Sequence, residues 1–272
     1  MNSPFLATVG KAPDFFGQPV ALLVFAHQDD EFGVFAVIDD CRQRGQRVVC
    51  AYLTHGAGGS AARRNAESLR VLARLGVAAT DVVFAGDLLG IADATLPRHM
   101  APAGAWLARW MGGFDKVDLI CAPAWEGGHH DHDALHFLTA RTAHALGLGA
   151  TLRQYALYNA WRCPPPLFRV LSPLAANGPV QRRPLAWGAR LRYLRLCLQY
   201  PSQLGTWVGL FPFVLLHYAL RGEQTLQPVT LERLAQRPHA GPLYYERRRF
   251  YTWQQMRHDM TTWLEGQPPH QK

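Results

Sequence analysis

The sequence predicts an α/β fold: a Rossmann-like, doubly wound and mostly parallel sheet with helices on both faces, followed by a helical and irregular C-terminal extension. Apolar runs of strand length alternate with helical patterns of about ten or more residues from Val20 to Tyr158, as in parallel βαβ units. Segments rich in His and Asp follow two of those runs, 20–26 and 117–123. Open α/β sheets bind their ligands at the carboxyl ends of such strands.

The elements of this core alternate without interruption. Glycines end the first two helices, and the segment 61–75 places its apolar residues at helical spacing. In chain order we expect strands at residues 20–26, 47–54, 81–85, 117–122 and 152–158, with helices at 31–44, 61–75, 98–112 and 131–146.

The pattern changes after Trp161. A proline run at 164–166 lies in a segment expected to be a loop, residues 162–185, and a basic amphipathic helix is expected at 185–198. Residues 204–220 are almost wholly apolar but only 17 in number, which is marginal for a membrane span. A helix packed over the core and an interfacial membrane contact are the alternatives.

We divide the chain into an α/β core, residues 1–161, and an extension, residues 162–272, that packs on the core and shapes its pocket without forming an independent domain. The composition, 49% hydrophobic and 18% charged, is that of an ordinary globular protein. The net charge of +8 comes from arginines in the second half of the chain: Arg182, Arg183, Arg190, Arg192, Arg195, Arg221, Arg247, Arg248 and Arg249. No nucleic-acid-binding module accompanies them, so we expect an anionic small molecule or an anionic membrane surface as partner, and no nucleic acid.

The cysteines are scattered and form no CxxC pair. The five are Cys41, Cys50, Cys121, Cys163 and Cys197. This usage predicts buried thiols in a reducing compartment rather than disulfides. Met1–Phe5 lacks the basic and then apolar order of a signal peptide. We therefore expect a cytoplasmic protein, with membrane association as an alternative; the oligomeric state stays open.

The first polar cluster, His27 to Glu31, directly follows the strand 20–26. One imidazole and three carboxylates in so short a turn are costly to bury unless a cation compensates them, and a catalytic zinc site needs three protein ligands and an open position. His27 ends the strand, and Asp30 can return to the same centre one tight turn later. Asp29 then projects toward the water that such a metal activates and is the expected general base. Glu31 is expected to support the helix start or the ligands.

The second cluster, His129 to Asp133, follows the strand 117–122. His132 at the helix start can point back toward the sheet edge, which completes a site of two histidines and one aspartate. His129 can donate a proton or stabilise an oxyanion. Asp131 can cap the helix or orient a histidine.

Three further histidines have less specific positions. His130 is expected to face away from the site, and His136, four residues after His132, is an alternative ligand. His55 ends a strand at the same edge, where it either lines the pocket or is an ordinary loop residue. Iron as Fe²⁺ would suit two histidines and one carboxylate nearly as well as Zn²⁺.

These residues match a known pattern. Ala26–Glu31 resembles the AHPDDE motif, and His129–His132 the HPDH motif, of the PIG-L (LmbE-like) family of zinc-dependent de-N-acetylases. Members of that family remove acetyl from N-acetylglucosamine linked to inositol, malate, lipids or antibiotic scaffolds. The resemblance covers residues 18–160 and extends to Arg64–Glu67, which is similar to an RxxE segment, and to Tyr200–Gln203, which is similar to a late SQ element.

The resemblance implies roles for individual residues. The zinc ligands would be His27, Asp30 and His132. The catalytic residues would be the base Asp29, the acid or oxyanion partner His129, and Asp131, which orients His129. The expected substrate-binding residues are Arg64, His55 and Gln203. For Arg64 the alternative is a solvated helix arginine paired to Glu67.

The sequence also departs from the family. Gln28 and His130 replace the prolines of the two motifs, and Gly127–Gly128 stands where some relatives place a tyrosine. The predicted function is a zinc-dependent hydrolase that removes the N-acetyl group from an amino sugar or its conjugate, which is anionic or lipid-linked if the arginines bind it. The alternative is a non-catalytic metal-containing module that binds an anionic membrane surface or nucleic acid through its basic C-terminal half.

Overall fold

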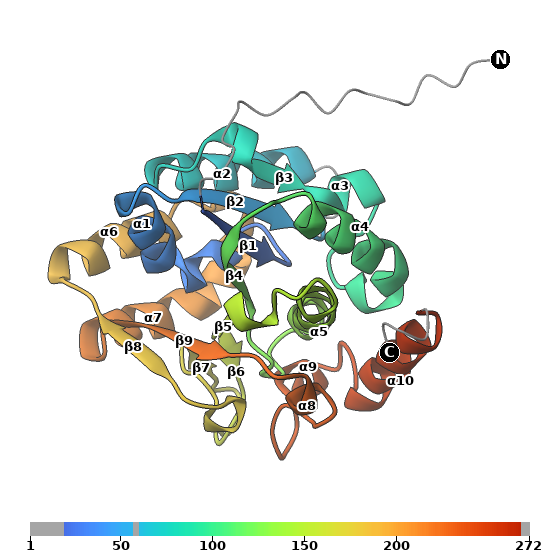
Figure 1. Cartoon of the computed structure of the whole chain (residues 1–272). Helices are drawn as coiled ribbons and strands as arrows, with labels where there is room; N and C mark the ends of the chain where they lie inside the picture. Colours follow the sequence, from blue (N-terminus) through green and yellow to red (C-terminus); the bar gives the residue numbers. More distant parts are fainter. Residues whose placement is uncertain (1–18, 57–59, 268–272) are drawn as a thin grey trace.

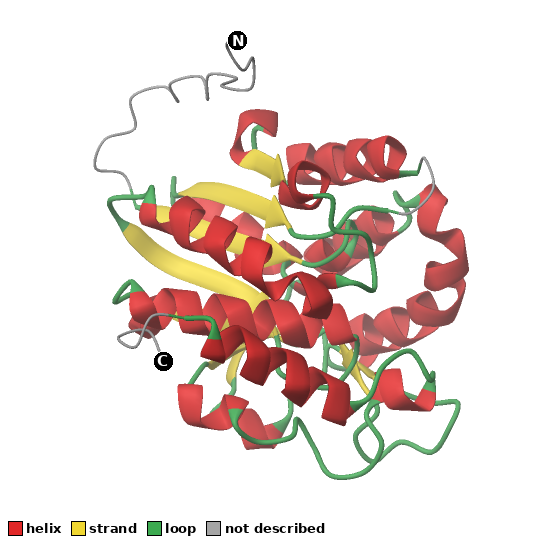
Figure 2. Ribbon diagram, turned by 90° about the vertical axis from the view of Figure 1, so that its right-hand side faces the viewer, coloured by secondary structure: helices red, strands yellow, loops and turns green. Residues whose placement is uncertain are grey.

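A seven-stranded sheet with the strand order β3-β2-β1-β4-β5-β9-β8 forms the centre of the structure, a computed structural model that describes residues 19–56 and 60–267. The pairs among β1 to β5 are parallel, whereas β9 is antiparallel to both β5 and β8. Helices cover both faces of the sheet (Figures 1 and 2). The predicted doubly wound, mostly parallel fold is therefore confirmed. The residues that bear on a signal peptide, Met1–Phe5, lie outside the described ranges.

The elements have the following bounds. The strands are β1 Val20–Phe25, β2 Arg47–Tyr52, β3 Val82–Phe84, β4 Val117–Pro123, β5 Leu152–Tyr155, β6 Tyr158–Asn159, β7 Arg169–Val170, β8 Gln181–Pro184 and β9 Glu223–Pro228. The α-helices are α1 Phe35–Gln43, α2 Ala61–Arg74, α3 Ala85–Leu89, α4 Met100–Gly112, α5 His130–Ala145, α6 Trp187–Cys197, α7 Leu204–Leu220, α8 Leu231–Leu234, α9 Tyr244–Arg247 and α10 Trp253–Glu265. β6 and β7 form a small separate sheet.

The central strand β1 is buried on both faces. Leu22 and Val24 point into a core shared with α4, α5 and α10, whereas Leu23 and Phe25 point into a second core shared with α1, α2, α6 and α7. Because successive side chains of a strand alternate between faces, an uninterrupted apolar run is what a strand between two helical layers requires.

The order of the strands places the two polar clusters side by side. The chain moves outward from β1 through β2 to β3 and then returns to add β4 on the other side of β1. β1 and β4 are paired as far as Leu23 and Cys121, so their carboxyl ends lie next to each other. This is the topological switch point at which open α/β sheets form their binding crevice.

The expectations for the C-terminal part were partly wrong. The segment 162–185, expected to be a loop, contains β7 and β8, and β9, for which no strand was expected, joins the main sheet next to β5. All four residues of β8 are exposed, and its Arg182 and Arg183 give no apolar alternation that would mark a strand. These strands form through pairing with distant residues, which their own sequence does not reveal.

Candidate active site

A tight turn after β1 brings the first two candidate ligands together. The backbone N–H of His27 donates to Asp30 Oδ2 (2.8 Å), and the backbone N–H of Asp30 donates to the His27 carbonyl (3.3 Å). The short 3₁₀ helix Asp30–Gly33 follows at once. The Asp30 carboxylate thus returns to the end of the strand, as the sequence predicts.

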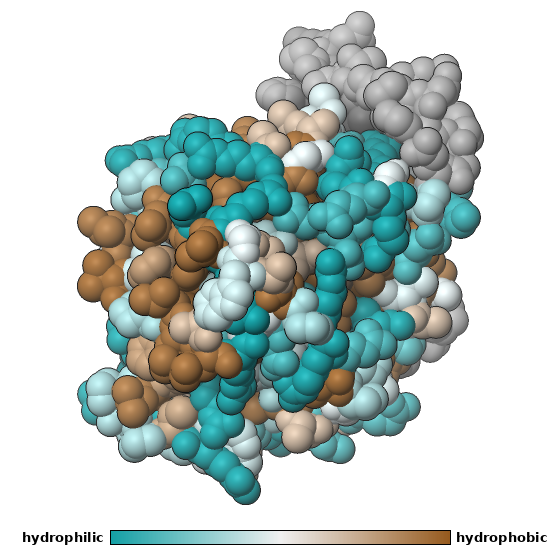
Figure 3. Space-filling view, turned by 90° about the vertical axis from the view of Figure 1, so that its left-hand side faces the viewer, coloured by the Kyte–Doolittle hydropathy of each residue, from teal (hydrophilic) through white to brown (hydrophobic). Residues whose placement is uncertain are grey.

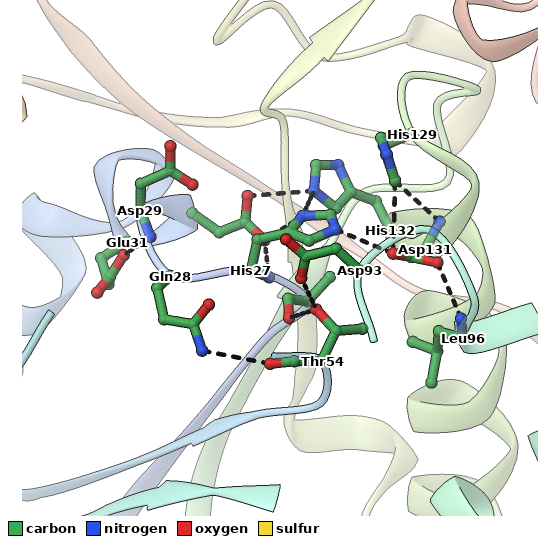
Figure 4. Close-up of polar contacts among 12 residues, drawn as sticks. His27, Gln28, Asp29, Glu31, Thr54, Asp93, Leu96, His129, Asp131 and His132 are labelled. Carbon is green, nitrogen blue, oxygen red and sulfur yellow. Dashed lines mark hydrogen bonds and ion pairs between the residues drawn. The ribbon is translucent and has the colours of Figure 1, made fainter. Parts of the chain in front are cut away.

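Three potential ligand atoms converge at the switch point (Figure 4). His27 Nδ1 lies 3.1 Å from His132 Nε2 and 3.5 Å from Asp30 Oδ2, and His132 Nε2 lies 3.1 Å from Asp30 Oδ1. Two donor atoms each about 2.1 Å from a tetrahedral ion are about 3.4 Å apart. Spacing, burial and donor chemistry therefore fit one divalent cation held by His27, Asp30 and His132.

Three residues supply the ligand atoms of this group, and two of them, His27 and Asp30, line a cavity. Among the described residues, a second group of donors combines His27 with His129 and Asp131. It would need the other ring nitrogen of His27, Nε2, which already contacts Asp131 Oδ2 at 3.0 Å. Three protein ligands with a free position are typical of catalytic rather than structural metal sites.

The carboxylate of Asp131 is hydrogen-bonded to His27 rather than to His129. Its carboxylate contacts His27 Nε2 and accepts hydrogen bonds from the backbone N–H groups of Ala94 (2.6 Å) and Leu96 (3.0 Å). His129 Nδ1 lies 3.8 Å from the same carboxylate and instead accepts the backbone N–H of Asp131, so His129 is the N-cap of α5. A carboxylate on the second nitrogen of a metal-binding histidine sets its tautomer and orientation.

Asp29 has a strained backbone. Its φ is 125°, a region that a residue with a Cβ rarely adopts, and its backbone N–H donates to Glu31 Oε2 at 2.7 Å. Glu31 is fully buried and also accepts a hydrogen bond from the Tyr52 hydroxyl. Strain of this kind is retained where surrounding contacts enforce it, often at functional sites. Glu31 therefore supports the turn, as expected.

Burial and neighbouring charges shift the pKa values of the cluster. Burial raises the pKa of Asp29 well above its ordinary value, and the adjacent Asp30 carboxylate adds to this effect. Burial would also raise the pKa of Asp30, but His132 and His27 outweigh it and lower that pKa. Burial, reinforced by repulsion from His27, holds the pKa of His129 well below its ordinary value. His129 is therefore a neutral ring at neutral pH.

A cavity of about 680 Å³ opens over these groups, a size that suits a small-molecule ligand. Its floor contains His27, Asp29, Asp30 and His129. Polar walls come from Arg64, Asp93, Gln203, Tyr158 and Tyr244. Apolar walls come from Phe32, Pro166, Leu167, Phe168, Leu210, Phe213 and Phe250.

Arg64 and Gln203 meet on one wall of the cavity. Arg64 Nη2 donates to Gln203 Oε1 at 2.8 Å, and Nη1 donates to Asp93. Glu67, the expected alternative partner of Arg64, instead contacts Arg63 at 3.4 Å and accepts hydrogen bonds from Ser202. Arg64 Nε is buried without a partner among the described residues. Arg64 and Gln203, both of which we expected to bind substrate, therefore line the cavity.

Other histidines lie away from the cavity. His55 is not among the described lining residues; its backbone pairs with the segment around Ala92, and its ring contacts the Gly56 carbonyl. His136, the alternative ligand, lies outside the cluster with its Nδ1 2.7 Å from the Pro123 carbonyl oxygen. His130 contacts the Ala94 carbonyl and stacks on Tyr251, so it faces away from the cavity as expected.

Asp93 and Tyr158 are two of the cavity residues that were not identified from the sequence. Asp93 accepts hydrogen bonds from Arg64 and Thr54 but follows no strand, so no local pattern marks it. Tyr158, which falls in a predicted strand, has its ring centroid 5.5 Å from that of His132. A Cβ at Gly128 would lie 2.1 Å from the Tyr158 carbonyl oxygen, so glycine there allows this close approach. Tyr158 thus lies beside Gly128, one of the two glycines that stand where the motif of some relatives has a tyrosine.

The comparisons with known proteins agree with this site. Residues 22–143 match the family model described as "PIG-L: GlcNAc-PI de-N-acetylase". No curated protein sequence matches the chain significantly.

Several solved structures share the fold at low sequence identity. A deacetylase triple mutant from the teicoplanin biosynthetic pathway is 17% identical, with a TM-score of 0.59, 78% of this chain and 98% of that chain being covered. The zinc-inhibited form of teicoplanin deacetylase Orf2 is 15% identical, with the same TM-score of 0.59 and the same coverage of 78% and 98%. An N,N'-diacetylchitobiose deacetylase from Pyrococcus horikoshii is 14% identical, with a TM-score of 0.54 and coverage of 78% and 84%. The match to the PIG-L family model therefore spans residues 22–143 and contains both clusters of the site.

Proposed function

We propose that this protein is a metal-dependent N-deacetylase that hydrolyses the acetamide of an N-acetylated amino sugar or its conjugate. The observation that carries the proposal is the convergence of His27, Asp30 and His132 beside the strained and buried Asp29, on the floor of one cavity. The family match and the deacetylases among the structural neighbours support the reaction class.

His27, Asp30 and His132 would hold the metal, for which we propose zinc, with Fe²⁺ as the alternative. One neighbour is described as a zinc-inhibited deacetylase, which supports a divalent metal at such a site. When bound, a divalent cation supplies Lewis-acid polarisation of the acetamide carbonyl and lowers the pKa of water. Asp131 orients His27 for this task through its 3.0 Å contact.

Asp29 is the proposed general base. Its carboxylate lines the cavity, and no described residue donates a hydrogen bond to it. A raised pKa makes a carboxylate a stronger base, closer to the value that suits proton transfer near neutral pH. Asp29 takes the proton from the attacking water and can return one to the departing amine.

His129 is the proposed partner of the developing oxyanion. Its ring lines the cavity, with its centroid 4.6 Å from that of His27. A neutral imidazole with its Nδ1 occupied by a backbone N–H carries its own proton on Nε2. That N–H can donate to the carbonyl oxygen as negative charge develops there.

The cavity walls supply the proposed recognition of the substrate. Arg64, which donates to Asp93 and Gln203, offers a guanidinium, and Gln203 offers an amide; these groups suit sugar hydroxyls or an anionic substituent. The apolar walls suit a hydrophobic aglycone. A closed, structural metal site would require a fourth protein ligand, and the described cluster has three; this favours an enzyme over a non-catalytic module. All five cysteines are unpaired, which supports the proposal of a reducing, cytoplasmic compartment.

The test is an Asp29→Ala variant assayed for acetate release from N-acetylglucosamine conjugates. We expect acetate release to fall by at least about a hundredfold, the typical contribution of a general base, while the metal content measured by mass spectrometry is retained. Asp118→Ala, which removes an exposed carboxylate from β4, is the matched control and should retain full activity. Acetate release at the wild-type rate from the Asp29 variant would overturn the proposal.

A further inference from the structure

The helix α7 exposes a face that contains no charged residue. Its exposed residues are the apolar Leu204, Val208, Leu215, Leu216 and Leu220, together with glycine, threonine, proline and alanine. Its titratable side chains, His217 and Tyr218, are buried. Surface helices of soluble proteins normally carry polar residues on the outward side. The exposed side of α7 therefore lacks the charged and strongly polar side chains expected on a helix that faces water.

The neighbouring helix α6 continues this surface. Trp187, Leu191 and Leu198 recur at i, i+4 and i+11 and are all more than half exposed. Eight of the twelve large hydrophobic residues exposed in the described ranges lie between Trp187 and Leu220. Figure 3 views the side of the molecule on which α6 and α7 lie, and apolar side chains gather there. We call the exposed apolar residues of α6 and α7 the apolar face. Contiguous apolar surface of this kind marks an interaction site.

Positive charge borders the apolar face. Residues 185–222 contain four arginines and no aspartate or glutamate, and of these arginines Arg192 pairs with Asp39 at 2.8 Å. Arg195, which lies between Leu191 and Leu198 on the exposed side of α6, has no acidic partner among the described residues. The guanidinium of Arg190 lies 4.3 Å from the ring centroid of Trp187. Helices that lie in the interface of anionic membranes carry leucine and tryptophan on one face, with arginines beside them.

The apolar face also joins the mouth of the cavity. Gly205, Thr206, Gly209 and Phe213 of α7 line the cavity, interleaved in sequence with the exposed Leu204 and Val208. Leu167 and Phe250 also line the cavity and are about half exposed. Exposed apolar side chains therefore continue from α7 to the lining of the cavity.

We propose that the apolar face docks on the surface of an anionic phospholipid bilayer and turns the mouth of the cavity toward the lipid. The helix Pro201–Leu220 has the length and hydropathy of a membrane span, 20 residues and a mean of 1.3. However, its other side buries Trp207, Leu210 and Val214 in the core and forms a cavity wall, so it lies on the membrane. A second copy of this chain is a less suitable partner for the apolar face, because a symmetric dimer would bring the same arginines of the two copies close together. The docking does not depend on the proposed reaction.

Vesicle co-sedimentation tests the docking directly. The full chain is mixed with vesicles of phosphatidylcholine alone or of phosphatidylcholine with phosphatidylglycerol. We expect binding to the mixed vesicles at least about tenfold tighter than to phosphatidylcholine, and weaker binding at high salt, because arginine attraction to anionic lipid is screened. Equal binding to both vesicle types, or binding to neither, would overturn the proposal.

A variant of the apolar face separates this surface from the rest of the molecule. Leu204→Gln, Val208→Gln and Leu215→Gln are combined, since none of the three residues lines the cavity. We expect at least about a tenfold loss of binding to the mixed vesicles, because insertion of each leucine or valine contributes apolar burial. Leu88→Gln with Leu146→Gln, two exposed leucines elsewhere, is the matched control and should bind as the wild type does.

The same variant tests the competing occupants. Its thermal midpoint and its acetate release from a soluble conjugate should equal those of the wild type, so that failure of the proposed reaction remains distinguishable from failure of docking. Vesicle binding that survives in the triple variant would overturn the proposal. So would a concentration-dependent dimer, or binding of a duplex oligonucleotide, that appears in the wild type without vesicle binding.

Discussion

Asp131 connects the candidate metal site to the loop that precedes α4. Its two carboxylate oxygens contact His27 Nε2 and the backbone N–H groups of Ala94 and Leu96. Burial would raise the pKa of Asp131, but the hydrogen bond to His27 and the charges of the neighbouring histidines together outweigh it and lower that pKa. The carboxylate is therefore charged at neutral pH and can raise the basicity of the His27 ring.

We predict that Asp131→Asn weakens metal binding about 10- to 100-fold, because the amide cannot hold the His27 ring in the same way. Competition with a chromogenic chelator measures this affinity. Asp133→Asn is the matched control: burial raises the pKa of Asp133 to about 8, so this side chain is already neutral at pH 7 and an amide resembles it. Unchanged metal affinity with reduced acetate release would show that Asp131 acts through His129 instead.

At the scale of elements, a buried glutamate joins the histidine loop to β6. Glu126 lies in the loop after β4, and its carboxylate accepts the backbone N–H groups of Leu157 (2.6 Å) and Tyr158 (3.0 Å) and the side chain of Asn159 (3.0 Å). These contacts bend the chain where one continuous strand, 152–158, was expected. They also place Tyr158 in the cavity.

The pH dependence of stability should report this contact. Burial raises the pKa of Glu126 from 4.5 to about 7, against the effect of its hydrogen bonds. A raised pKa in the folded state means that the folded protein binds the proton more tightly. The stability that comes from the protonated group is therefore complete below pH 4.5 and is lost as the pH rises to about 7.

We predict that the free energy of unfolding of the wild type falls relative to Glu126→Gln by about 3 kcal/mol across this window, because the glutamine does not titrate. Urea unfolding of chelator-treated protein at pH values below, within and above the window measures the difference. A difference between the two proteins that stays constant with pH would contradict the assignment.

At the scale of the whole molecule, the candidate metal site joins two halves of the sheet. His27 follows β1 and His132 lies in α5 after β4, so their paired ring nitrogens come from residues 105 positions apart. Bound metal would cross-link these halves at the switch point. The same edge carries the cavity, and α7 of the extension closes one side of it.

We predict that metal stabilises the fold. A cation at a hundredfold excess over its Kd should add about 2.7 kcal/mol to the free energy of unfolding, which raises Tm by several degrees. Thermal unfolding with zinc and with a chelator measures the shift. His132→Ala removes one ligand and should abolish the metal-dependent part of Tm. A wild-type Tm that does not respond to the chelator would argue against a bound metal.

The sequence by itself determined the order of the core elements and the edge at which the chemistry lies. The apolar runs of β1 and β4 need two helical layers, and the polar residues that follow them must leave the sheet at its carboxyl edge. The turn from His27 to Asp30 involves only neighbouring residues, so the sequence could predict that both side chains reach the same metal position. The two motifs also resemble those of the family whose model matches residues 22–143.

Only the tertiary structure decided which groups meet across the chain. Asp131 contacts His27, Arg64 contacts Asp93 and Gln203 instead of Glu67, and β9 joins the sheet beside β5. None of these pairs follows from a local period, because each joins segments that are far apart in sequence. The sequence marked α7 as apolar, and the fold decided that one of its sides packs on the core, one lines the cavity and one remains exposed. The apolar sequence of α7 does not distinguish these sides, and packing against segments far away in the sequence decides which of them is buried.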